Sequence, residues 1–166
     1  MPRPDTNPQP LRRLLQQELT LGNRLLAILQ EETDVIVKND ITRLSALQAE
    51  QQQCLKEQTV LEKSRETTTR DLAWALGMER VPALPTLILA LPDRDQESLR
   101  RLRTELLAVS QQLEIVQTRN RSLLENALDY VRFSLDLLTE AALQPARYGA
   151  NLTRISAPTF YIDSKA

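Results

Sequence analysis

The stretch LRRLRTELLAVSQQLEIVQTRNRSLLENALDYVRFSLDLLTEAA, residues 99–142, carries the most regular pattern in the chain. Mostly apolar residues recur in it by alternating steps of three and four, which is the spacing of a heptad seam along one side of an α-helix. The positions of this first seam are Leu99, Leu102, Leu106, Val109, Leu113, Val116, Asn120, Leu123, Ala127, Tyr130, Ser134, Leu137 and Ala141. A helix that rises ~1.5 Å per residue is here far longer than the core of a compact domain needs, so we expect an elongated molecule.

The composition also favours helices. The chain has 166 residues, of which 42% are hydrophobic and 26% charged, as in an ordinary soluble domain. Aromatic residues make up only 4%, and glycines number three, too few turn-forming residues for a many-stranded fold. We therefore predict an all-α protein, an elongated antiparallel helical bundle or coiled coil of three long helices.

The helices are expected at about residues 11–38, 40–76 and 94–142, which together form one bundle domain over residues 11–142. The proline-rich residues 1–10 predict a disordered leader, and residues 143–166, after the helix-ending Pro145, predict a flexible tail. Asn39 or Asp40 can cap the second helix. At residues 38–40 a tight turn that makes an antiparallel hairpin is favoured over a continuous bent helix.

The second helix has a polar middle and only a thin apolar seam. The seam positions are Leu44, Leu47, Leu55, Leu61, Leu72 and Leu76. Gly77 is expected to end the helix. Trp74 is expected to plug one end of the bundle, because an indole buries a large area. The proline-rich connector predicts one short buried helical turn, and Asp93 with Gln96 predicts a capping box for the last helix.

Several classes of function lose their key residues. With 21 basic and 22 acidic residues, the net charge of −1 gives no sign of the basic patch or stripe that binding to nucleic acid or an anionic membrane requires. The absence of histidine removes histidine-ligated metals and histidine-based catalysis, and the glycines lie too far apart for a phosphate loop. The acidic EETD at residues 31–34 is expected to be a solvated face. We predict no enzyme, no cofactor and no metal site.

The single cysteine, Cys54, fits a reducing compartment and is expected on a helix surface or seam. The N-terminus lacks the apolar core of a secretory signal, and the longest apolar run, LPTLILALP, is far too short to span a bilayer. The expectation is therefore a cytoplasmic protein that does not insert into membranes.

Downstream of Asn120 a second apolar seam appears beside the first, at Leu124, Leu128, Val131, Leu135 and Leu138. One interpretation is a stutter, in which the core moves from the first seam to the second. It leaves Leu123, Tyr130, Phe133 and Leu137 uncovered. The other interpretation is a docking surface for a partner helix, made of Leu123, Leu124, Leu128, Tyr130, Val131, Phe133, Leu135, Leu137 and Leu138. The polar Asn120 at a seam position can specify register whether the surplus apolar face binds a partner protein or a second copy of the chain.

The chain resembles the FlgN family of flagellar type III export chaperones over residues 11–149. The resemblance is carried by the Leu76-Gly77 pair that closes the polar middle helix, by NRSLLENAL from Asn120, and by the later Tyr-Gly pair. It implies a chaperone that holds the C-terminal helical segments of hook-associated proteins, prevents their premature assembly and passes them to the export gate. Residues 120–142 then engage the substrate, and Tyr148 with Gly149 dock on the cytoplasmic domain of the gate.

The alternative is a self-associating coiled-coil structural or adaptor protein, whose surplus apolar face pairs with a second copy. The two hypotheses differ in oligomeric state, since only the second requires a stable dimer or larger assembly. The spaced aromatic and aliphatic residues of the tail, from Tyr148 to Ile162, fit a segment that orders on binding, while an inert tail stays equally open.

Overall fold

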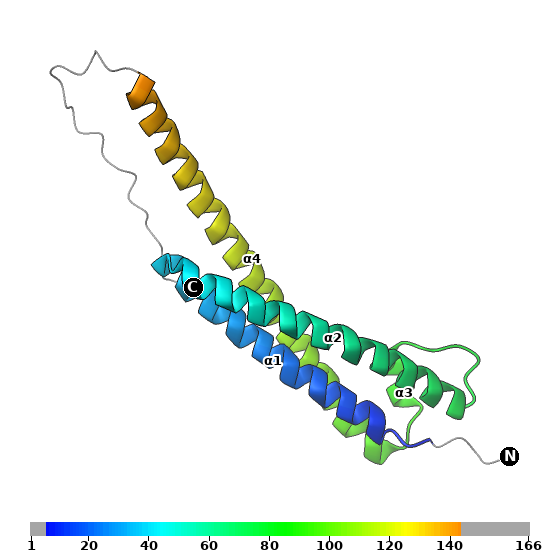
Figure 1. Ribbon diagram of the computed structural model, residues 1–166. Coiled ribbons are helices and arrows are strands. Elements are labelled where there is room, and N and C mark those ends of the chain that lie inside the picture. Colours follow the sequence, from blue (N-terminus) through cyan, green and yellow to red (C-terminus); the bar gives the residue numbers. More distant parts are fainter. Residues whose placement is uncertain (1–5, 144–166) are drawn as a thin grey trace. The chain divides into compact units, whose positions relative to one another are not determined.

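The structure is a computed structural model that describes residues 6–143, and the side chains of residues 6–140. In this part of the chain it contains α1 (Gln9–Lys38), α2 (Ile41–Ala75), α3 (Leu84–Leu89) and α4 (Asp93–Leu143), and no strand (Figure 1). The prediction of an all-α bundle with three long helices is confirmed. The chain divides into two units, Met1–Asn126 and Ala127–Ala166, and α4 contributes to both.

In the first unit α1 and α2 form an antiparallel hairpin, and α4 runs beside them in the direction of α1 (Figure 1). One core cluster joins the start of α1 to the end of α2, to α3 and to the start of α4: Leu11, Leu15, Leu19, Leu72, Ala73, Leu87, Ile88, Leu91, Leu99 and Leu102. A second joins the rest of α1 to α2: Leu21, Leu25, Ile28, Leu29, Val35, Leu47 and Cys54, with Leu113 and Val116 of α4 packed against it. The first seam of α4 therefore faces α1 along this unit.

Helix α1 begins at Gln9, inside the segment expected to be a leader, and Leu11 is already buried. Prolines at the helix start explain this, because the first turn needs no backbone N–H from them. The side-chain oxygen of Asn7 accepts a hydrogen bond of 3.0 Å from the Gln9 N–H. Residues 1–5 lie outside the described part.

The turn between α1 and α2 is tight, which confirms the predicted antiparallel hairpin and excludes a continuous bent helix. Asn39 has φ 55°, a left-handed conformation that asparagine tolerates. The N–H groups of Asn39 and Asp40 donate to carbonyls of the last turn of α1, each at 3.1 Å. The Asp40 carboxylate caps α2 by accepting from the Arg43 N–H at 3.0 Å.

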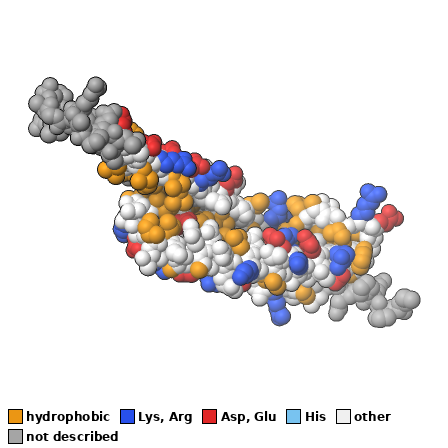
Figure 2. Space-filling model, turned by 45° about the horizontal axis from the view of Figure 1, so that its top comes forward, with side chains coloured by type: hydrophobic (Ala, Val, Ile, Leu, Met, Phe, Trp, Pro, Cys, Tyr) orange, Lys and Arg blue, Asp and Glu red, His pale blue; other side chains and the backbone are white. Residues whose placement is uncertain are grey.

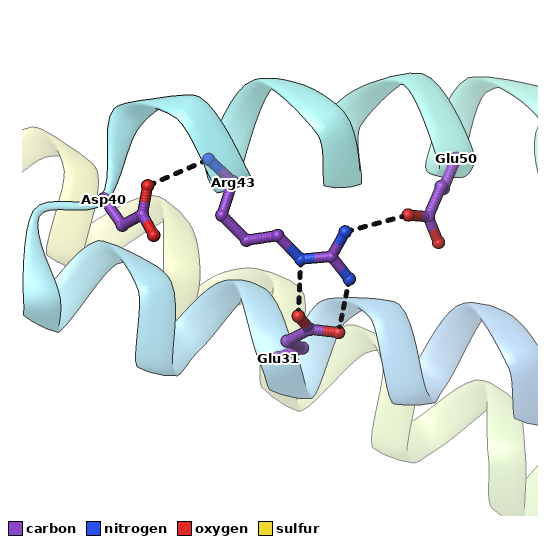
Figure 3. A network of polar contacts seen from close by, with 4 residues as sticks. All are labelled: Glu31, Asp40, Arg43 and Glu50. Carbon is purple, nitrogen blue, oxygen red and sulfur yellow. Dashed lines mark hydrogen bonds and ion pairs between the residues drawn. The ribbon is translucent and has the colours of Figure 1, made fainter.

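Arg43 ties the two helices together next to this turn (Figure 3). Its Nε and Nη2 donate to the two carboxylate oxygens of Glu31 on α1, at 2.7 and 2.9 Å. Its Nη1 donates to Glu50 on α2 at 3.2 Å. The hydrogen bonds from Arg43 lower the pKa of Glu31 below its usual value. The pair is solvent-exposed, so it orients the hairpin more than it stabilises it.

The seam of α2 differs from the prediction at its centre. Leu55 was predicted to face the core, but it is exposed, and Cys54 occupies the buried position at 1% exposure. Cys54 lies one heptad after the buried Leu47 and therefore shares its face, whereas Leu55 is turned away by about 100°. The cysteine thus serves as a small core residue, in agreement with the expectation of a seam position.

The prediction that Trp74 plugs an end of the bundle is wrong. Leu72 and Ala73 fill the core there, and a side chain two residues past Leu72 points about 200° away from it. Trp74 is 59% exposed. The Arg70 guanidinium lies over the indole, 5.7 Å from the ring centroid, in a cation–π contact.

The connector between α2 and α4 contains the predicted short buried helix, α3, through Leu87 and Ile88. Gly77 ends α2 with φ 76°, as predicted. The predicted capping box is wrong, because Asp93 is already the first residue of α4. The Pro92 carbonyl accepts from the Asp95 N–H at 2.9 Å, and the Gln96 side-chain amide donates to the Leu91 carbonyl at 2.7 Å.

Candidate functional site

The described part of the second unit is the continuation of α4 from Ala127 to Leu143. Its large apolar side chains are 48–67% exposed: Leu128, Tyr130, Val131, Phe133, Leu135, Leu137 and Leu138. Figure 2 shows hydrophobic side chains along one side of this segment and charged side chains along the other. Such a concentration of exposed apolar area on one short segment of a helix is typical of a binding surface.

The segment is helical for local reasons. Leucines and alanines, which favour helices, dominate it, and it contains no glycine or proline. Arg132 forms an ion pair of 3.5 Å with Asp129 one turn earlier. The hydroxyls of Ser134 and Thr139 donate to the carbonyls of Tyr130 and Leu135, at 2.9 and 2.8 Å, and are satisfied within the helix.

Both seams are open to solvent in the second unit. The stutter interpretation predicted that the second seam is buried in place of the first. Instead, Leu128 and Leu135 of the second seam are as exposed as Leu137 of the first. The stutter is therefore wrong for residues 127–140, and both seams are left available to a partner.

The predicted site residues fall in different places. Leu123 and Leu124 belong to the first unit and are half-buried there. The other seven predicted contact residues are the exposed side chains named above. Tyr148 and Gly149, predicted to dock on the export gate, lie outside the described residues, as does the rest of the tail.

The first seam contains a buried polar residue, Asn120, which is only 3% exposed. Its Nδ2 donates to the Leu29 carbonyl at 2.8 Å and to Glu32 Oε2 at 2.9 Å. Its Oδ1 accepts from the Thr33 hydroxyl at 2.5 Å. Because every polar group of this side chain has a partner on α1, a shift of α4 along α1 breaks several buried hydrogen bonds at once. Asn120 therefore specifies register, as the sequence suggested.

Glu32 corrects another expectation. Residues 31–34 were predicted to be a solvated face, and Glu31 and Asp34 are indeed exposed. Glu32, however, is 7% exposed and bound to Asn120. The signal was present in the spacing, because Glu32 lies four and three residues after Ile28 and Leu29, on the buried face of α1.

A cleft that the sequence did not indicate lies in the first unit among α1, α2 and α4. Its volume is about 320 Å³, and its lining includes Gly22, Leu25, Leu106 and Val109 together with Arg65. Arg65 pairs with Glu18 at 2.7 Å. A Cβ on Gly22 would lie 3.0 Å from Val109 Cγ1, so the missing side chain lets α1 and α4 approach closely.

The described residues contain neither of two other kinds of site. Nowhere in residues 6–140 do three or more histidine, cysteine, aspartate or glutamate side chains gather as a metal would require. None of the described helices combines the length and hydropathy needed to span a bilayer.

Comparison with known proteins agrees with the resemblance that the sequence motifs suggested. The family model described as FlgN protein matches residues 1–153 of the chain. Neither the curated proteins nor the solved structures that were compared with the chain gave a significant match.

Proposed function

Because the chain belongs to the FlgN family of flagellar export chaperones, we propose that it binds the C-terminal helical segments of hook-associated proteins. In this proposal it acts in the cytoplasm, prevents premature assembly of these proteins and delivers them to the export gate. The observation that supports the proposal most strongly is the exposure of seven large apolar side chains between Leu128 and Leu138.

The energetics of this surface fit a reversible complex. Full burial of a leucine, valine or phenylalanine side chain is worth about 1.5–3 kcal/mol, and these side chains are about half exposed. Covering them gains several kcal/mol, against which stands the cost of ordering and association. An amphipathic helix that otherwise polymerises through its apolar face is kept monomeric when α4 covers that face.

The proposal uses no cofactor, no nucleotide and no chemical step. Release then follows from displacement at the export gate. For that step we propose Tyr148 and Gly149 as the docking residues for the cytoplasmic domain of the gate, which keeps gate binding separate in sequence from substrate binding at residues 123–138.

Isothermal titration calorimetry with C-terminal peptides of the same organism's hook-associated proteins tests substrate binding. The variant Leu128→Asp with Val131→Asp places two charges on the apolar face. We expect saturable binding by the wild type and a loss of affinity of about 10- to 100-fold in the variant, since each of the two side chains is about half exposed and can gain only part of the ~1.5–3 kcal/mol that full burial is worth.

The matched control is Thr118→Asp with Ser122→Asp, which makes the same change in charge at two exposed polar positions of α4. It should bind like the wild type. No heat with any of the peptides, together with a dimer that the apolar-face variant dissociates, would refute the proposal and favour the self-associating coiled coil.

Gate docking has its own test. The variant Tyr148→Ala should keep its affinity for the hook-associated peptides and lose binding to the purified cytoplasmic domain of the gate. Unchanged binding to that domain would remove Tyr148 from the proposal and leave substrate binding untouched.

A further inference from the structure

The exposed face of the second unit is wider than one partner helix can cover. Within residues 127–140 the first seam consists of Ala127, Tyr130, Ser134 and Leu137, and the second of Leu128, Val131, Leu135 and Leu138. At about 100° per residue, the midlines of the two seams lie about 100° apart around the helix axis. Phe133 extends the apolar surface beyond Leu137, so this surface takes up more than half of the circumference.

A single packed helix covers a stripe only about 100° wide. A partner helix placed on the second seam leaves Leu137 and Phe133 in water. A partner helix placed on the first seam leaves Leu128 and Leu135 in water. All four are exposed in the structure. Resting on the function proposed above, we propose that this face takes a two-helix segment of the partner, with one helix along each seam.

The charges on either side of the face differ in sign. Arg132 lies just beyond the edge formed by Leu128 and Leu135, and Thr139 beside it is uncharged. Glu140 lies beyond the opposite edge, next to Phe133, and Asp129 and Asp136 lie between Glu140 and Arg132 on the polar side of the helix. The helix on the first seam therefore carries a basic residue opposite Glu140, and the helix on the second seam carries an acidic residue opposite Arg132.

These charges are available to a partner. The ion pair between Arg132 and Asp129 spans 3.5 Å, and both side chains are 74% exposed, so it is weak in water. Asp136 and Glu140 form no ion pair with any described residue.

A second copy of the chain fits this face less well than a two-helix partner. Its matching segment is one helix, which covers one seam and leaves the other open. It also brings the same excess of acid, because residues 127–140 contain three acidic side chains and one basic side chain. Like charges in contact disfavour pairing.

Two seam variants test the inference, with the same hook-associated peptides as probes. The first-seam variant is Ala127→Asp with Leu137→Asp, and the second-seam variant is Leu128→Asp with Val131→Asp. All four side chains are exposed, so the bundle of the first unit should fold normally, which circular dichroism and the protection of the Cys54 thiol check. The control is again Thr118→Asp with Ser122→Asp.

For a two-helix partner we expect each seam variant to weaken binding by about 10- to 100-fold, and the combined variant to abolish it. Glu140→Lys should weaken binding in the wild type and have no further effect in the first-seam variant. If one seam variant binds within about twofold of the wild type, a single helix occupies the face and the inference is overturned.

If the proposed function itself is wrong, the calorimetric result differs from the outcomes above. In that case the wild-type protein gives no heat with any peptide, and both proposals fall together. Sedimentation of the protein without peptide tests whether a second copy of the chain occupies the face. A stable dimer that either seam variant dissociates would assign the face to a second copy and overturn the inference.

Discussion

Replacing Asn120 by alanine should destabilise the first unit far more than an asparagine substitution usually does. Asn120 Nδ2 is the donor to the buried Glu32 carboxylate at 2.9 Å, and a hydrogen bond to a charged group contributes about 1.5–3 kcal/mol. The bonds to the Leu29 carbonyl and from the Thr33 hydroxyl are neutral and contribute about 0.5–1.5 kcal/mol each.

The loss in free energy of unfolding is smaller than the sum of the contributions of these hydrogen bonds. The Thr33 hydroxyl lies 3.2 Å from the Leu29 carbonyl and can turn to it when Asn120 is gone. The charge of Glu32 has no such replacement. We therefore expect the free energy of unfolding to fall by about 3 kcal/mol, which is more than 100-fold in the unfolding equilibrium.

Urea unfolding followed by circular dichroism measures this loss, and labelling of Cys54 reports opening of the first unit independently. Cys54 is the only cysteine, and it is buried in the same core cluster as Leu29. The labelling rate should rise in proportion to the opening equilibrium. The control Asn126→Ala, at an exposed position of α4, should change stability by less than about 0.5 kcal/mol.

A double-mutant cycle identifies the cause. In the background Glu32→Leu no buried charge remains, so Asn120→Ala should cost about 1.5–3 kcal/mol less than in the wild type. A loss below about 1 kcal/mol for Asn120→Ala alone, or equal losses in the two backgrounds, would refute the reasoning that a stranded carboxylate dominates.

Two further predictions concern the ends of α2. Arg43→Ala should lower stability by less than Asn120→Ala, because the ion pair of Arg43 with Glu31 is exposed to solvent. Since the pKa of Glu31 is lowered in the folded state, the pair contributes to stability above the unfolded pKa, and this contribution disappears as pH falls through the folded pKa. Melting curves of the wild type and the variant should therefore converge in acid and stay apart at neutral pH. Gly77→Ala should lower the free energy of unfolding, measured by urea titration, by about 1–2 kcal/mol, because φ 76° is strained for a residue with a Cβ. Asparagine tolerates this conformation better than alanine, so a Gly77→Asn variant that loses as much stability as Gly77→Ala would contradict this explanation.

The helices were predictable because their signals are local. The heptad spacing of α4 and the cap at Asp40 depend on residues within one or two turns of each other. The left-handed residue at Gly77 depends only on its own lack of a Cβ. None of these features requires knowledge of the tertiary partner.

The errors at Leu55, Trp74 and Glu32 concern which side of a helix meets the core. Helix α2 is polar in its middle and nearly uniform around its circumference, so its own sequence hardly distinguishes Cys54 from Leu55. The neighbouring helices select the face. Glu32 was misjudged for the converse reason, since a carboxylate is acceptable on a buried face only because Asn120, distant in sequence, supplies a hydrogen bond.

The apolar surface at residues 128–138 could be found from the sequence, because an apolar stripe that is too wide for one core is itself a local property of the sequence. The exposure of Leu128 to Leu138 is consistent with that argument. The identity of the partner is not a local property of this chain. In the proposal made above it depends on a second protein, whose charges and helices match the two seams.

The exposed position of Trp74 has a consequence for optical experiments. The indole is the only tryptophan fluorophore of the chain, and it is already in contact with water in the folded state. Its emission spectrum should therefore shift little when the bundle unfolds, so a flat fluorescence trace in denaturant is no sign of a protein that resists unfolding. A blue shift on adding another protein would instead report that this end of α2 has been covered.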